Sequence, residues 1–418
     1  METRPAVKEN IVRLTEKGVD IPDPFSIHIG EEVDPDHISG DGVKIHPGCR
    51  IYGAGTVISG GCRIGREGPV TIENCRLGSS VELKGGYFKN SVFLEKADMA
   101  YGAHVREGCI LEEQAGGAHC VGLKQTILFP FVTLGSLINF CDCLMAGGTS
   151  RRDHSEVGSS YIHFNFTPEG DKTTPSLIGD VPRGVMLNQP RIFLGGQGGI
   201  VGPVRLGFGN VVAAGTILRN DVIEDKKLIV GKTHKERIVD VASCSYPRLG
   251  RILENNFIYI ANLLALEQWY IHVRQEFFLR RQFGGLIYRG AMENLAGAIT
   301  ERLKRLETMA GKAFGQKVSK NPKVPIDARS ELGRNIGQVI DIFNTEAASG
   351  LAGEIRDPFL SELQSHKASG NADYIDFIQS LPASVSGNGT RWLERIVKDF
   401  CLRAKEALPS MSLFGNME

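Results

Sequence analysis

Short units that begin with an aliphatic residue and contain glycine recur at intervals of close to six residues between positions 43 and 222. Clear copies are IHPGCR at 45–50, IYGAGT at 51–56, LGSSVE at 77–82, LGFGNV at 206–211 and VAAGTI at 212–217. A six-residue period fits neither an α-helix nor an isolated hairpin. It is typical of a parallel β-helix, in which short strands and tight turns stack coil upon coil. The aliphatic side chains would fill the shaft, and glycine would lie where the backbone turns. The sequence therefore predicts a β-solenoid.

Beyond the repeat, glycine and proline thin out and apolar residues follow a helical spacing of three or four. The chain has 418 residues, more than one core usually holds. We expect an N-terminal helix and cap over 1–42, a parallel β-helix over 43–225, and an α-helical domain over 226–418. Helices are predicted at 5–18, 246–282, 290–311, 328–348, 354–366, 371–381 and 389–407, with a linker at 314–327. Their apolar stripes indicate packing faces rather than cofactor sites.

Charge and hydropathy exclude several classes of function. Lys plus Arg and Asp plus Glu both number 48, so no nucleic-acid groove or polybasic membrane surface is indicated. No apolar stretch reaches about 18 residues and none follows Met1, so we expect no membrane span, no signal peptide and a cytoplasmic protein. The nine cysteines lack zinc-site spacing. No metal is therefore predicted, and buried free thiols are favoured over disulfides.

The least regular part of the repeat region is 147–192, which contains Arg151-Arg152-Asp153-His154 and the aromatic stretch around His163. Polar insertions in a solenoid form loops on one face, which is often the binding face. We therefore expect binding residues in or beside this segment.

Several segments resemble one enzyme family, the acetyltransferase half of bifunctional N-acetylglucosamine-1-phosphate uridyltransferase/glucosamine-1-phosphate acetyltransferase. The similar segments are VREG at 105–108, GAH at 117–119, VGLK at 121–124, and those at 135–142, 157–172, 193–203 and 214–222. The resemblance covers about 43–225. It implies a hexapeptide-repeat transferase with a left-handed parallel β-helix, assembled as a homotrimer with sites between neighbouring subunits.

The resemblance also implies the substrate site. Arg106 and Lys124 match a basic pair that holds the sugar phosphate, and Asn165 and Lys172 match residues that complete the sugar site. Asp142 matches an acidic residue that could accept hydrogen bonds from an amino sugar. A phosphate monoester suits an arginine fork beside a lysine point charge. The alternatives are solvated charges on the solenoid face and, for Asn165 and Asp142, turn or ladder residues.

Acetyl-CoA, the cofactor implied by the resemblance, would lie along small residues that match Ser159, Gly196 and Ala214. An extended pantetheine arm requires backbone amides and no bulky side chains.

Two departures from the family pattern concern the chemistry. The general-base histidine falls on Ser136 and a sugar-site tyrosine falls on Asn139. Acylation of an amine requires a base, and serine alone cannot serve. His154 and His163 are candidate replacements, with surface or packing roles as the alternatives. The uridyltransferase half has no counterpart in this sequence.

Two functions are therefore open. The first is a transferase, acyltransferase-like, that acts on a sugar phosphate or nucleotide sugar in amino-sugar or UDP-N-acetylglucosamine metabolism, with an acyl-CoA donor. The second is a non-catalytic module that binds a sugar nucleotide, or a scaffold whose helical domain recruits a partner. The missing histidine favours the second, whereas the basic pair and the small residues favour the first.

Overall fold

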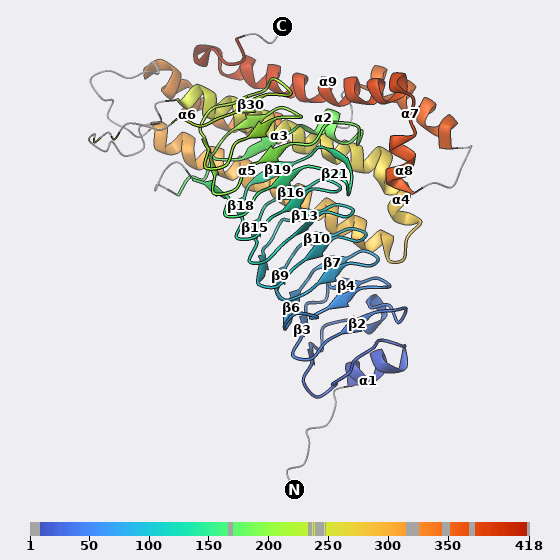
Figure 1. Ribbon diagram of the computed structural model, residues 1–418. Coiled ribbons are helices and arrows are strands. Elements are labelled where there is room, and N and C mark those ends of the chain that lie inside the picture. Colours follow the sequence, from blue (N-terminus) through green and yellow to red (C-terminus); the bar gives the residue numbers. More distant parts are fainter. Residues whose placement is uncertain are drawn as a thin grey trace.

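The structure is a computed structural model that describes residues 9–165, 170–232, 236, 238, 246, 248–314, 326–344, 352–367 and 373–415. Figure 1 shows a long stack of coils that begins near helix α1 (Glu9–Glu16) and ends beneath a layer of helices. The fold is a left-handed parallel β-helix followed by an α-helical region, as the sequence predicts.

Each coil of the solenoid contributes one short strand to each of three parallel sheets. Sheet A contains β2 (Lys44–Ile45), β5 (Arg63–Ile64), β8 (Glu82–Leu83), β11 (Asp98–Met99), β14 (Gly116–Gly117), β17 (Thr133–Leu134), β22 (Glu156–Val157), β25 (Phe193–Leu194), β28 (Val211–Val212) and β30 (Leu228–Ile229). Sheet B contains β1 (His28–Ile29), β3 (Arg50–Tyr52), β6 (Val70–Glu73), β9 (Gly86–Lys89), β12 (Ala103–Val105), β15 (Gly122–Lys124), β18 (Asn139–Cys141), β23 (Ile162–Phe164), β26 (Gly199–Val201) and β29 (Ile217–Leu218). Sheet C contains β4 (Val57–Ile58), β7 (Arg76–Leu77), β10 (Val92–Phe93), β13 (Ile110–Leu111), β16 (Ile127–Leu128), β19 (Cys143–Met145), β24 (Ser176–Ile178) and β27 (Arg205–Leu206).

The chain always passes from sheet A to B, then to C, and back to A, so the solenoid has three edges that we name AB, BC and CA. The aliphatic residue of each repeat unit points into the shaft, as Ile45, Ile51 and Ile58 show with no exposed surface. Each such side chain contributes about 1.5–3 kcal/mol by leaving water. Backbone hydrogen bonds join each coil to the next, for example from His46 N to Ile64 O at 2.8 Å.

The coils begin earlier than the repeat in the sequence. Strand β1 pairs with β3, and isolated bridges join Asp20 to Lys44 and Ile38 to Ile58. Residues 20–38 therefore form a first coil, which lies within the predicted cap and before the predicted start of the β-helix at 43. Helix α1 lies at this end of the stack and buries Ile11 and Leu14. The first part of the helix predicted at 5–18 lies outside the described residues.

One insertion interrupts the last coils at edge CA. It contains the antiparallel hairpin of β20 (Gly148–Ser150) and β21 (Asp153–His154). A second segment at this edge forms the short helix α2 (Val181–Gly184), which Asp180 caps by accepting from the Arg183 backbone N–H. Both insertions lie in the irregular stretch that the sequence predicted to form loops.

The C-terminal region is helical, and its helices lie near the predicted positions. They are α3 (Leu249–Trp269), a π-helical turn (Tyr270–Arg274), α4 (Gln275–Leu279), α5 (Gly284–Phe314), α6 (Ile326–Ile342), α7 (Gly353–Lys367), α8 (Tyr374–Gln379), α9 (Ala383–Ala407) and a 3-10 turn (Pro409–Met411). Helix α3 is apolar on most of its circumference, which is the pattern of a helix buried between neighbours. Most of the predicted linker lies outside the described residues.

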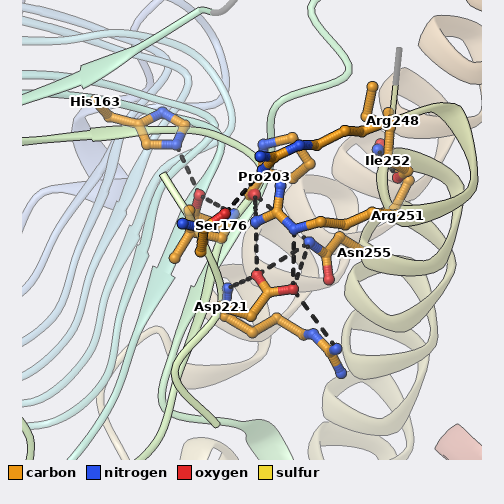
Figure 2. Close-up of polar contacts among 12 residues, drawn as sticks. His163, Ser176, Pro203, Asp221, Arg248, Arg251, Ile252 and Asn255 are labelled. Atoms are coloured by element: carbon orange, nitrogen blue, oxygen red, sulfur yellow. Dashed lines mark hydrogen bonds and ion pairs between the residues drawn. The ribbon is translucent and has the colours of Figure 1, made fainter. Parts of the chain in front are cut away.

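The helices pack against sheet C and its edges. Arg76 of β7 pairs with Glu293 of α5 at 2.7 Å, and Asn294 donates to the carbonyls of Asn90 and Cys109. Figure 2 shows a second junction, where Asp221 accepts hydrogen bonds from the α3 residues Arg251 and Asn255. These contacts fix the helical region on the solenoid.

None of the described helices has the length and apolar character needed to cross a membrane. The eight cysteines in the described part of the chain are free thiols, and six of them are buried.

Candidate functional site

Basic residues gather on sheet B where it meets edge BC. Arg106 directly follows β12, and its backbone N–H donates to Leu123 O at 2.8 Å. Lys124 therefore lies one coil beyond Arg106, and Lys124 in turn pairs in register with Cys141. The sheet brings the two predicted phosphate ligands into adjacent positions, with a spacing of about 4.8 Å between their strands.

The cations of this edge differ in how they are paired. Lys124 Nζ contacts Glu107 Oε1 at 2.6 Å, and this hydrogen bond is the main cause that lowers the pKa of Glu107. The exposed Arg106 guanidinium and Lys172 ammonium have no hydrogen-bond or ion-pair partner within the described part of the chain. Arg106 and Lys172, unpaired beside the paired Lys124, can donate hydrogen bonds to an anionic group from solution.

Lys172 lies at the same edge, in the connection from β23 to β24. Cys141 lies near the three cations, because Arg106, Lys124 and Lys172 are all close enough to its thiol to affect its pKa. Burial and the neighbouring Asp142 carboxylate raise the pKa of Cys141, and the three cations oppose that rise. We call Arg106, Lys124 and Lys172 the basic edge.

Asn165 follows β23, which is the strand next to β18 in sheet B. Its side chain is exposed at edge BC. Three strand spacings separate it from Arg106, or roughly 14 Å. The four residues predicted to bind the sugar phosphate therefore lie on one edge of the solenoid.

Asp142 differs from the expectation. Its carboxylate is buried and forms an ion pair with Arg302 of α5, with 2.8 Å between Oδ1 and Nη2. Burial raises the pKa of Asp142 and Arg302 opposes the rise. The predicted contact with an amino sugar is thus replaced by a contact with the helical region, because α5 crosses the edge at this point.

The three residues predicted to lie along the acyl donor stack at edge AB. Ser159 Oγ accepts from the Ser136 N–H at 3.2 Å, and a Cβ on Gly196 would lie 2.7 Å from Ser159 O. A Cβ on Gly195 would lie 2.4 Å from Ala214 N, so small residues follow one another from coil to coil. Ser159 and Ala214 are exposed and Gly196 is half-buried. This line of small residues lies at the opposite margin of sheet B from the basic edge.

His154 lies at edge CA, away from both groups. Its Nδ1 is 2.9 Å from Arg151 O, and its Nε2 is 3.8 Å from Glu156. Within one chain it does not meet the basic edge or the small residues, because the three groups occupy three different edges.

His163 lies in the core of the solenoid, which argues against the predicted role as a base. Its Nε2 is 2.9 Å from Ser176 Oγ, and burial lowers its pKa to about 4 (Figure 2). The side chains along β23 alternate between inside and outside, and His163 occupies an inward position. His163 is in register with Phe140 of β18, which also points inward. This register could have indicated a core position for His163, but only if the limits of each coil had been known from the sequence.

Arg302 and Cys141 are the residues of this edge that the sequence did not indicate. Arg302 lies in the run ERLKRLE, where charges at helical spacing indicate a solvated face. The described residues contain no group of three or more His, Cys, Asp or Glu side chains arranged to hold a metal ion.

Comparisons with known proteins give two relatives with the same name. Bifunctional protein GlmU of Oleidesulfovibrio alaskensis is 24% identical over 245 residues, which are 57% of this chain and 46% of that protein. Bifunctional protein GlmU of Lawsonia intracellularis is 26% identical over 134 residues, or 32% of this chain and 25% of that protein. The chain therefore spans less than half the length of these curated relatives. No protein-family model matches it.

Proposed function

The chain resembles the hexapeptide-repeat transferases in sequence and in coil architecture, and from this premise we propose that it transfers an acyl group from acyl-CoA to a sugar phosphate or nucleotide sugar. The observation that carries the proposal is the basic edge, with two exposed cations that have no partner among the described residues. The phosphate binds Arg106 through its planar fork and Lys124 and Lys172 as point charges. Asn165 contacts the sugar.

The acyl-CoA arm lies along Ser159, Gly196 and Ala214. Neighbouring coils approach closely at Gly196, where a Cβ would lie 2.7 Å from Ser159 O, so the line carries only short side chains and backbone amides, which supports this assignment. An extended pantetheine has amide groups that backbone amides and hydroxyls satisfy.

The two halves of this site require more than one subunit. The basic edge and the small residues lie at opposite margins of sheet B, so one chain keeps the phosphate and the acyl donor apart. A neighbouring copy that brings its edge AB against edge BC would join them. We therefore include a homotrimer in the proposal, with the site between subunits.

The removal of the amine proton has no assigned group at the basic edge. Ser136 occupies the position of the family base, and His154 could act there only from a neighbouring subunit. This gap, together with the capture of Asp142 by Arg302, favours a second candidate function. In it the protein binds a sugar nucleotide without transferring anything to it.

The test measures binding and transfer separately. UDP-N-acetylglucosamine, glucosamine 1-phosphate and acetyl-CoA are added singly, and the shift in thermal unfolding is followed. Thiol release from acetyl-CoA is then measured with glucosamine 1-phosphate as acceptor. Stabilisation by acetyl-CoA with thiol release supports the transferase. Stabilisation by the sugar ligands alone supports the binding protein.

Arg106→Ala is the diagnostic variant for the phosphate. It should lower the affinity for the sugar phosphate about tenfold, which is the effect of losing one charge-assisted hydrogen bond. Arg63→Ala is the matched control, because Arg63 is an exposed arginine on the outer face of sheet A. Equal effects of the two variants would refute the assigned phosphate site.

Ala214→Leu is the diagnostic variant for the acyl donor. Ala214 is exposed, so leucine fits without strain in the fold but fills the line of small residues. Acetyl-CoA should then no longer stabilise the protein, whereas Ala54→Leu, an exposed alanine at edge BC in the early coils, should leave that stabilisation intact.

A further inference from the structure

The segment that carries Lys172 is held almost wholly by the helical region. It connects β23 to β24, and its described part begins at Gly170. Tyr246 donates a short hydrogen bond to Asp171, and Asn256 of α3 donates to Thr173 O at 3.1 Å. The hydroxyl of Thr173 contacts Met309 of α5 at 3.4 Å. Asp171 and Thr173 are fully buried, whereas Lys172 between them is exposed.

Arg302 is central to this anchoring. Its guanidinium is 2% exposed and bridges two groups of the solenoid, since Nη2 pairs with Asp142 at 2.8 Å and Nη1 donates to Lys172 O at 3.0 Å. Arg305, one turn further along α5, lies 3.5 Å from Gly170 O. The guanidinium of Arg302 thus connects Asp142, at the end of β18, to the segment that carries Lys172.

The backbone of Lys172 forms a tight turn. Its φ of 53° lies in the left-handed region, which other corners of the solenoid also adopt, for example at Asn74, Asn90 and Gln125. Contacts from the helical region surround this turn, since Tyr246 bonds Asp171, Arg302 bonds the Lys172 carbonyl and Asn256 bonds the Thr173 carbonyl.

We propose that Arg302 is a positioning residue that holds Lys172 at the basic edge, so that the α-helical region completes the anion site of the solenoid. The ligand part of this inference rests on the proposed function, whereas the positioning part does not. The ligand class is a phosphate-bearing sugar, which meets Lys172 only while α5 keeps the segment in place.

Trypsin cleavage of the intact chain after Lys172 tests the positioning directly. Cleavage requires the segment to open, so its rate reports local stability at this site. Arg302→Met should raise the rate of cleavage at Lys172 about tenfold or more. Arg274→Met is the matched control, because Arg274 is an equally buried arginine of the helical region paired with Glu113 at edge CA. Because Arg274→Met should lower global stability at least as much, cleavage is expressed as the ratio of the rate at Lys172 to the rate at other trypsin sites of the solenoid. Arg274→Met should leave that ratio within about twofold of wild type, whereas Arg302→Met should raise it.

A double variant separates positioning from simple charge neutralisation. Asp142→Asn with Arg302→Met leaves no buried charge unpaired, so the chain should fold, while the Lys172 carbonyl still lacks its donor. Rapid cleavage at Lys172 in the double variant supports the proposal. Protection equal to wild type would overturn it, because Arg302 would then serve only to neutralise Asp142.

Binding of glucosamine 1-phosphate completes the test. Arg302→Met and Lys172→Gln should each weaken binding about tenfold, and the two together should weaken it no further. Unchanged affinity in Arg302→Met would contradict the link to the ligand. If the wild type binds no sugar phosphate, the proposed function fails, and the cleavage rates still decide whether Arg302 positions the segment.

Discussion

Two buried arginines of the helical region contact the solenoid, and they meet different surroundings. Arg274 enters at edge CA, where it pairs with Glu113 at 2.6 Å, lies 4.0 Å from Glu112 and covers the Tyr374 ring at 3.8 Å. Arg302 enters at edge BC, where it pairs with Asp142 and the Lys172 carbonyl. Both are 2% exposed.

The two arginines differ in the charged groups that surround them. At edge CA two carboxylates share one cation inside an aromatic cage, and burial, with Glu113 nearby, raises the pKa of Glu112 to about 7. At edge BC one carboxylate is matched by one cation, and the adjacent cations stay exposed. A buried arginine–carboxylate pair therefore closes an interface at edge CA, whereas at edge BC such a pair lies beside the candidate binding residues.

The largest expected effect is that of Arg274→Met. The change leaves Glu113 without its partner and removes the cation from the Tyr374 ring, so the free energy of unfolding should fall by about 4 kcal/mol. Urea unfolding monitored by circular dichroism measures it. A loss below about 1 kcal/mol would mean that edge CA is held by apolar contacts alone.

Arg302→Met should cost less, about 3 kcal/mol. Asp142 would remain buried, but Lys172 and Lys124 act on it and a proton can neutralise it, since burial already raises its pKa. The same urea experiment compares the two variants. A loss larger than that of Arg274→Met would reverse the ranking of the two edges.

Glu112→Gln sharpens the comparison through pH. The pKa of Glu112 is about 7 in the folded protein and near 4.5 in the unfolded chain, so the folded state binds the proton more tightly. The stability that this proton confers is complete below about pH 4.5 and is lost as pH rises through about 7. Relative to Glu112→Gln, the wild type should lose roughly 2–3 kcal/mol between pH 4.5 and 8. Parallel pH profiles of the two proteins would contradict the raised pKa.

Arg251→Met should have the smallest effect, about 1 kcal/mol. Arg251 is 23% exposed, and Asp221 keeps a hydrogen bond from Asn255 and the Arg205 backbone N–H after the change (Figure 2). The stability loss at this partly exposed contact between helix and solenoid therefore serves as a reference for the losses at the two buried contacts. A loss of about 3 kcal/mol or more here would show that burial does not set the ranking.

The repeat predicted the coils because its information is local. Each unit states which residue points inward and where the chain turns, and this holds whatever the next coil contains. The first coil was missed because 20–38 carries three prolines and no hexapeptide unit. Helix α5 begins at Gly284, before its predicted start at 290. Its first two residues, Gly284 and Gly285, are poor helix formers, so the sequence pattern did not indicate these first turns.

The candidate site was predictable only in part. The resemblance and the coil spacing placed Arg106 and Lys124 in adjacent coils, and the structure brings Asn165 and Lys172 to the same edge. The roles of these residues, of the acyl-CoA line and of His154 stay predictions. Asp142 and His163 are buried rather than open to a substrate. Asp142 pairs with Arg302 of helix α5, and the alternation of side chains along β23 directs His163 into the core.

By itself the sequence determined the parallel coils, the helical character of the second half and the line of small residues, because each depends on neighbours within a few residues or one coil. Only the tertiary structure decided which charges are buried and which are free. Arg302 and Asp142 are 160 positions apart in the chain, and no local pattern distinguishes a buried arginine from a solvated one. Their contact depends on where a whole helix packs, which the summed contacts of both regions determine.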